Sequence, residues 1–359
     1  MNPSENLSNS PGRMCPIDYY YGAAAIADAP TAVADCAWIV GGLYGNPFAL
    51  DVIEQAFDAE ASHHKRLIFN GDFHWFDAEP DWFARIQNRV LQYDALRGNV
   101  ETECSRAACD PAIGCGCAYP SYVDDEVVNR SNRILGELWQ ACHSGGFAGA
   151  LQQLSQYRHL EIGDARIAVV HGDLDSLAGW TFDTDALSSR VGLMKAGRML
   201  SESAFDIVAC SHTCAPVLRR FEYPGEEPRT LVNNGAAGMP NFRNDLGGVV
   251  TRISEVPLSR IGEQRLRALR LRVLHERQQA GVWVESIAID YDPEQWWQLF
   301  SSRWPPGSDA EASYGARIQH GCSASIQQAY PSLAGRRATI ARELIRSRAS
   351  VPATPSTDR

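Results

Sequence analysis

The fold is indicated by the stretch Leu67-Ile68-Phe69-Asn70-Gly71-Asp72, in which a short apolar run ends at a polar turn. A run of this kind is typical of a buried strand, and the polar residues after it predict a loop. The same pattern recurs along the chain, with helical stretches between the copies. Strands that alternate with helices predict an α/β sheet, in which ligands collect beyond the carboxyl ends of the strands.

Five further apolar runs end in the same way. They are Trp38-Ile39-Val40 before Gly41-Gly42, Ala95-Leu96 before Arg97-Gly98-Asn99, Ile167-Ala168-Val169-Val170 before His171, Ile207-Val208-Ala209-Cys210 before Ser211-His212, and Leu231-Val232 before Asn233-Asn234-Gly235. Four side chains with metal affinity therefore follow four strands: Asp72, Asn99, His171 and His212. A carboxylate, an amide oxygen and two imidazoles suit Mn, Fe or Zn. Taken singly, each also has a structural explanation as a helix cap, a turn or a hydrogen-bonded histidine.

The composition bounds the class of protein. The chain has 359 residues, of which 45% are hydrophobic and 21% charged, enough to build a sizeable core. Its net charge of -10 offers no global attraction to nucleic acid or anionic lipid. No run approaches the roughly 20 apolar residues of a spanning helix, and the polar segment 1–13 lacks an apolar signal core. We therefore expect a soluble, cytoplasmic protein with neither a membrane nor a nucleic-acid partner.

Five short motifs follow the predicted strands in a fixed order. They are Gly41-Gly42-Leu43-Tyr44-Gly45-Asn46, Gly71-Asp72, Gly98-Asn99-Val100-Glu101, His171-Gly172 and Ser211-His212-Thr213-Cys214. This order resembles the calcineurin-like metallophosphoesterases, whose pattern is D-x-H-G-N, G-D-x-x-D, G-N-[HCV]-[DE], H-G after a strand, and G-H-T-H. The resemblance spans roughly residues 37–255. It implies a four-layer α-β-β-α sandwich that hydrolyses a mono- or diester bond in a small phosphorylated substrate.

The resemblance also implies which metal ligands are kept. In the family, one metal is held by the first-motif Asp and His and by the last His of G-H-T-H. These positions align with Gly42, Tyr44 and Cys214, so every ligand unique to that metal is missing. The ligands of the second metal are complete, as Asp72, Asn99, His171 and His212.

We therefore predict one divalent ion, Mn, Fe or Zn, and two functions remain open. The first is a metal-dependent phosphoesterase, an enzyme with a single retained metal. The second is a catalytically weak or inactive metal-binding or regulatory protein on the same scaffold, because the alignment of an attacking hydroxide by two ions would be lost.

Three residues are candidates for catalysis. His74 is considered as an added ligand or proton donor, and Arg97 as a group that steadies the developing charge. Tyr44 would fill the vacated metal space with its ring, while its hydroxyl could still point at a phosphate.

Cys104, Cys109, Cys115 and Cys117 lie close together in a glycine-rich segment that follows the Gly-Asn motif. Their spacing differs from the C-x2-C pairs of zinc and iron–sulfur sites. Two interpretations stay open: a reduced loop that overhangs the metal site, or a second centre holding zinc or an iron–sulfur cluster.

The organisation along the chain completes the prediction. We expect a lead-in over 1–30, a metallophosphoesterase-like domain over 31–255 with a cysteine-rich insertion over 102–120, a helical and aromatic extension over 256–349, and a disordered tail over 350–359. The extension has six arginines between Arg260 and Arg277, interpreted as a solvated helix face, and an alternating edge strand over 282–291. The aromatic residues and Arg317 of segment 296–317 would either recognise a nucleobase or sugar phosphate or pin the extension to the domain.

Overall fold

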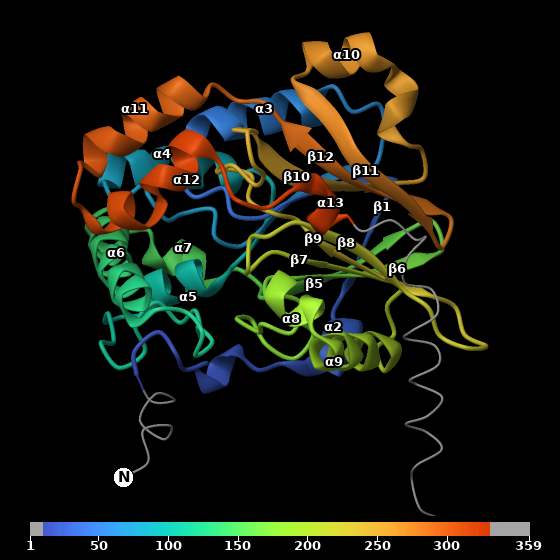
Figure 1. Ribbon diagram of the computed structural model, residues 1–359, viewed down its shortest axis with the longest axis horizontal. Coiled ribbons are helices and arrows are strands. Elements are labelled where there is room, and N and C mark those ends of the chain that lie inside the picture. Colours follow the sequence, from blue (N-terminus) through green and yellow to red (C-terminus); the bar gives the residue numbers. More distant parts are fainter. Residues whose placement is uncertain (1–9, 331–359) are drawn as a thin grey trace, which may run out of the picture.

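The computed structural model describes residues 10–330, which build two six-stranded sheets with helices around them (Figure 1). The first sheet has the strand order β1 (Thr31–Ala34), β5 (Tyr157–Ile162), β6 (Ala165–Val170), β7 (Ile207–Cys210), β9 (Arg229–Asn233), β8 (Val217–Phe221). The second has the order β11 (Leu271–Gln279), β12 (Val282–Ile289), β10 (Gly248–Ser254), β2 (Cys36–Val40), β3 (Lys65–Asn70), β4 (Asp94–Leu96).

The helical segments connect and cover these strands. In chain order they are η2 (Ile17–Tyr19), α2 (Gly22–Ala27), α3 (Pro47–Asp58), α4 (Pro80–Val90), α5 (Asn99–Ser105), α6 (Asp125–Ser144), α7 (Ala148–Gln152), α8 (Thr184–Ser188), α9 (Arg190–Ser201), η3 (Leu258–Ile261), α10 (Glu263–Ala268), α11 (Pro293–Arg303), η4 (Glu311–Gly315), α12 (Ala316–His320) and α13 (Ile326–Ala329). Within residues 10–330, no helix is both long and apolar enough to cross a bilayer.

Strand β2 shows why the sheets stack on each other. All of its residues are buried, and successive side chains point to opposite faces of the sheet. Ala37 and Ile39 join a cluster between the two sheets, together with Ile167 and Val169 of β6. A strand with two apolar faces must be covered on both sides.

Helices supply the outer layers of the sandwich (Figure 1). Trp38 and Val40 face away from the first sheet and belong to the same apolar cluster as Leu50 of α3 and Phe83 of α4. On the other side, the helices α2, α8 and α9 bury apolar residues in a cluster with β6 and β7. The predicted α-β-β-α sandwich is therefore confirmed.

Parallel pairing sets where the strands end. β2, β3 and β4 run parallel, as do β6, β7 and β9. Their registers pair Val40 with Phe69 and Cys210 with Asn233, so the carboxyl ends of neighbouring strands lie level with one another. The loops after these strands therefore meet along one edge of the sandwich, as expected for an α/β sheet.

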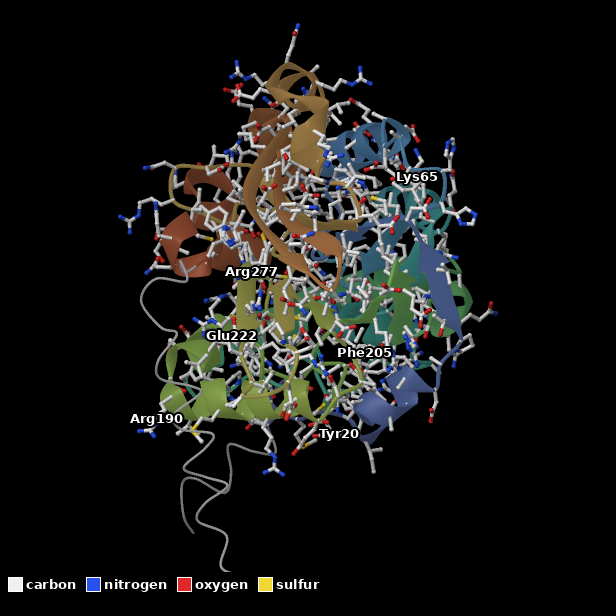
Figure 2. All side chains as sticks on the ribbon, turned by 90° about the vertical axis from the view of Figure 1, so that its right-hand side faces the viewer. Tyr20, Lys65, Arg190, Phe205, Glu222 and Arg277 are labelled. Atoms are coloured by element: carbon white, nitrogen blue, oxygen red, sulfur yellow. The ribbon has the colours of Figure 1, made fainter. Side chains whose placement is uncertain are left out.

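The chain after residue 255 differs from the prediction. The expected helix over 258–280 is wrong for its second half, because Leu271–Gln279 forms strand β11 at the edge of the second sheet. The predicted edge strand lies one place further in: β12 pairs with both β10 and β11. Figure 2 shows Arg277 of β11 and Glu222, which follows β8, on facing edges of the two sheets.

The aromatic segment packs against the domain. Trp296, Phe300 and Trp304 are buried, and the indole N–H of Trp304 donates to the carbonyl of Phe76 at 2.8 Å. Near the amino terminus, Tyr19 is also buried and donates its hydroxyl to Glu103 at 2.7 Å. The predicted tail over 350–359, the extension beyond Tyr330 and the first nine residues of the lead-in lie outside the described residues.

Candidate metal centre

Four side chains from four strand ends meet at one point. Nε2 of His171 lies 3.3 Å from Oδ1 of Asp72, 3.1 Å from Oδ1 of Asn99 and 3.3 Å from Nδ1 of His212. Asp72, Asn99 and His171 are buried, and His212 is partly exposed. Among residues 10–330, the group Asp72, His171 and His212 is the one set of three or more acidic, thiol or imidazole side chains close enough to share an ion.

Backbone carbonyls fix the orientation of three of these side chains. Nδ1 of His171 donates to the carbonyl of Asn70 at 2.9 Å, so its proton lies there and Nε2 keeps a free lone pair. Nε2 of His212 donates to the carbonyl of Cys117 at 3.0 Å, which frees Nδ1. The amide of Asn99 donates to the carbonyl of Cys115 at 3.0 Å, so its oxygen turns inward. Two imidazole lone pairs, an amide oxygen and a carboxylate oxygen therefore converge, and this donor set fits a divalent cation.

The electrostatics of the cluster point the same way. Burial lowers the pKa of His171, but the charge of Asp72, its hydrogen bond to the ring and the hydrogen bond to the carbonyl of Asn70 together outweigh burial, and the net change is upward. Burial and the neighbouring His171 lower the pKa of His212 to about 4. The carboxylate of Asp72 thus stabilises a positive charge beside His171, and a bound cation would supply that charge.

Glu101 shapes the turn that presents Asp72. Asp72 has a left-handed backbone with φ of 54°, which is costly for a residue other than glycine. The buried carboxylate of Glu101 accepts the backbone N–H groups of Asp72 and Gly98, both at 2.8 Å, and those of Phe73 and His74 at 3.0 and 3.3 Å. Sequence reasoning gave Glu101 no role, although the acidic position of G-N-[HCV]-[DE] marks it.

Gly98 lets two of the candidate ligands approach the backbone. A Cβ atom at this position would lie 2.5 Å from Oδ1 of Asp72 and 2.8 Å from Nε2 of His171. Any side chain here would displace both, so the site requires glycine.

The cysteine-rich segment contacts the cluster mainly through its backbone, and the amide of Asn99 also donates to Sγ of Cys117 at 3.3 Å. The carbonyls of Cys115 and Cys117 hold Asn99 and His212, and the indole of Trp180 donates to the second carbonyl at 2.8 Å. The four thiols of the segment do not form a ligand set within the described residues: Cys109 is exposed while the other three are buried, and no group of three is within reach of one ion. The loop therefore overhangs the site, as one of the two interpretations predicts.

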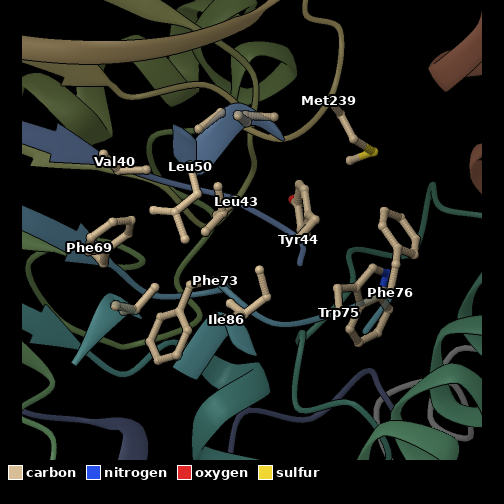
Figure 3. Close-up of a cluster of buried hydrophobic side chains, with 14 of the residues drawn as sticks. Val40, Leu43, Tyr44, Leu50, Phe69, Phe73, Trp75, Phe76, Ile86 and Met239 are labelled. Carbon is tan, nitrogen blue, oxygen red and sulfur yellow. The ribbon is translucent and has the colours of Figure 1, made fainter. Parts of the chain in front are cut away.

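The residues that align with the first-metal ligands of the family pack against one another. The hydroxyl of Tyr44 donates to Sγ of Cys214 at 2.6 Å, and a Cβ on Gly42 would lie 2.8 Å from both of these side chains. Figure 3 shows the Tyr44 ring within the buried apolar cluster, beside Met239. Burial, followed by the charges of Cys214 and Asp72, raises the pKa of Tyr44, which keeps its hydroxyl protonated.

The other two catalytic candidates lie outside the cluster. His74 is buried, its Nδ1 lies 2.6 Å from a carboxylate oxygen of Asp77, and its ring stacks on Phe83 with centroids 3.6 Å apart. Arg97 is half-buried and donates to the carbonyl of Gln152 at 3.3 Å. Neither contact places these groups against the four converging side chains.

Comparison with known proteins adds evidence on the fold. No protein-family model matches the chain, and no curated protein does. A hypothetical protein from Pyrococcus horikoshii OT3 aligns over 82% of this chain and 100% of its own, with 15% identity and a TM-score of 0.51. A metallophosphoesterase from Sphaerobacter thermophilus aligns over 80% and 100%, with 14% identity and a TM-score of 0.48. A serine/threonine phosphatase from Saccharomyces cerevisiae aligns over 72% and 81%, with 16% identity and a TM-score of 0.33.

The first of these similarities shows a shared fold. Together with the two stacked sheets, it supports the sandwich fold that the motif order predicts. The chain has the two-sheet α-β-β-α fold that this hypothetical protein shares.

Proposed function

We propose that this protein is a metal-dependent phosphoesterase that works with one divalent ion, Mn, Fe or Zn. Asp72, Asn99, His171 and His212 would hold the ion. The convergence of their four ligand atoms around Nε2 of His171 is the observation that carries the proposal. The substrate would be a small phosphate mono- or diester.

The ion would act as a Lewis acid on a phosphoryl oxygen and lower the pKa of a coordinated water toward ~7. The chain's own residues provide the preorganised surroundings. Glu101 holds the backbone of Asp72 and Gly98 in place, and the carbonyls of Asn70 and Cys117 keep the two imidazoles in the tautomers that leave their inner nitrogens free. Because these contacts hold the candidate ligands in fixed orientations, little reorganisation would be needed at the moment of reaction.

A second function is favoured by the contents of the first-metal position. Tyr44 and Cys214 fill that space with a hydrogen-bonded pair, so an attacking group has no second ion to align it. On this reading the protein binds one ion and a phosphorylated ligand without turnover, and acts as a metal-binding or regulatory protein.

One assay separates these functions. The purified full-length chain is tested for hydrolysis of p-nitrophenyl phosphate and bis-p-nitrophenyl phosphate with added Mn, Fe or Zn. Turnover that disappears in His171→Ala and persists in His63→Ala, a substitution of an exposed histidine, supports the enzyme. One bound ion without turnover on a broad phosphate panel supports the regulatory protein. A wild-type chain that binds no ion contradicts both.

A further inference from the structure

A cavity of about 650 Å³ opens beside the loop that carries His212. Thr213 and Cys214, which directly follow His212 in the loop after β7, form part of its wall. Further wall residues come from α8, β8, the segment around Phe242 and the chain on both sides of Ser325. The volume lies within the range of pockets that bind small molecules, about 300–1,000 Å³, and is too small for the surface of a folded protein.

Arg317 of α12 is a half-buried cation in this wall. Its Nε donates to the carbonyl of Pro240 at 2.8 Å, and Nη2 donates to the carbonyl of Cys214 at 3.5 Å. These contacts use two of the five N–H groups of a guanidinium. Within residues 10–330 no carboxylate forms an ion pair with Arg317, whereas the more deeply buried Arg252 is paired with Glu60 and Glu285.

The position of Arg317 relates it to the missing first metal. Its anchor, the carbonyl of Cys214, belongs to the residue that stands where the family has its last metal-binding histidine. The positive charge also acts on Tyr44 and on Cys214, where it opposes the effect of burial on each pKa. The guanidinium of Arg317 therefore places a positive charge beside the position that Tyr44 and Cys214 fill.

The rest of the wall suits an organic group. Leu187, Phe242 and Ala324 contribute apolar surface, while Thr184 and Gln328 contribute polar groups. The wall contains two guanidinium groups, those of Arg317 and Arg219, and one carboxylate, that of the exposed Asp185, so its formal charge favours an anion.

We propose that this cavity binds the organic group of a small phosphate ester and that Arg317 binds a phosphate oxygen on the side where the first metal is missing. The inference rests on the proposed function, because it places the phosphate between Arg317 and the ion held by His212 and its neighbours. It assigns the substrate class as a small organophosphate rather than a phosphoprotein. A fixed guanidinium offers a phosphate two parallel hydrogen bonds as well as charge.

Binding calorimetry with inorganic phosphate and phenylphosphonate, a stable analogue of a phosphate monoester, tests the proposal on the Mn-loaded full-length protein. We expect the wild type to bind phenylphosphonate more tightly than phosphate. Arg317→Gln should weaken both about tenfold or more, while one Mn per chain remains bound. Arg267→Gln, on an exposed arginine of α10, is the matched control and should change neither affinity. Ala324→Phe, which fills the cavity, should weaken phenylphosphonate alone.

The outcomes separate this proposal from the proposed function. Wild-type affinities in Arg317→Gln, or equal effects of Ala324→Phe on the two probes, overturn the assignment while leaving the metal site intact. A wild type that binds no Mn defeats the proposed function itself, and the same titrations on the metal-free protein then test Arg317 by itself. If Arg317→Gln does not unfold cooperatively, Arg317→Lys takes its place and should still weaken phosphate binding, because the forked donor is lost.

Discussion

Replacing Glu101 by glutamine tests how the metal centre is built. Each carboxylate oxygen accepts two backbone N–H groups, and glutamine keeps only one oxygen, so two N–H groups would face an amide NH₂. A hydrogen bond to a charged acceptor contributes roughly 1.5–3 kcal/mol, so the loss of two would cost about 3–6 kcal/mol. Burial, and next the charge of Asp72, raises the pKa of Glu101, so the buried negative charge is itself destabilising. A neutral amide at this position removes that cost and offsets part of the loss. We therefore expect a loss of about 3 kcal/mol in the free energy of unfolding.

The substitution should also weaken metal binding, because the turn that presents Asp72 loses its anchor. Partners that orient metal ligands typically contribute about 10- to 100-fold to affinity, and we expect a loss in that range. Urea unfolding followed by tryptophan fluorescence measures the stability, and competition with a chelating dye measures the affinity for Mn.

Glu103→Gln is the matched control, since Glu103 is buried in the same helix α5 and contacts Tyr19 and Arg106 instead of the Asp72 turn. It should lower stability and leave the affinity for Mn unchanged. Wild-type affinity in Glu101→Gln, or equal losses of affinity in the two variants, would refute the reasoning.

Three further predictions follow from named contacts. Gly98→Ala should lower the affinity for Mn at least tenfold, because its Cβ would lie 2.5 Å from Oδ1 of Asp72. In the control Gly136→Ala, in helix α6, the new Cβ meets nothing within 4 Å, so the affinity should stay unchanged while the free energy of unfolding rises by up to ~1 kcal/mol. Similar affinities in the two variants, measured by the same dye competition, would count against a rigid ligand shell. The double change Cys115→Ser and Cys117→Ser should keep the Mn affinity within about threefold, because carbonyls hold Asn99 and His212, and a serine hydroxyl at position 117 can still accept the 3.3 Å contact that the amide of Asn99 makes with the thiol of Cys117; loss of the bound ion in elemental analysis would indicate that the thiols are ligands. Arg252 lowers the pKa of Glu60 to about 2 against the cost of burial, so this pair adds stability above pH 4.5 that is lost as the pH falls toward 2. Glu60→Gln should therefore cost about 2 kcal/mol at pH 7, allowing for partial solvent screening, and progressively less in urea titrations below pH 4.5; a pH-independent difference would show that the charge is irrelevant.

The sequence predicts the sandwich and the four converging side chains because both depend on short local patterns. Apolar runs that end at Asp72, Asn99, His171 and His212 specify strands whose carboxyl ends meet, and parallel pairing then brings the four residues together. The space-filling role of Tyr44 can also be predicted from the sequence, because a larger aromatic ring occupies the position of the first-motif histidine.

The rest depends on contacts that residue types do not encode. His212 and Asn99 donate to the backbone carbonyls of Cys117 and Cys115. Because every residue has a carbonyl, the sequence does not mark these contacts, and the residue types at these positions point to the thiols. The helix prediction fails over strand β11 because the exposed Arg272 and the half-buried Arg277 lie on an edge strand, where charged residues are compatible with either structure. The sequence predicts His74 at the site, whereas in the structure its side chain pairs with Asp77 and stacks on Phe83 in the core.

Anomalous diffraction from a crystal of the full-length protein grown with Mn tests the central claim most directly. The account predicts one anomalous peak per chain, at bonding distance from Asp72, Asn99, His171 and His212, and no peak near Tyr44 and Cys214. Two peaks roughly 3.5–4 Å apart, the spacing of a two-metal site, would contradict the single-ion account, and so would the absence of any peak among the four side chains.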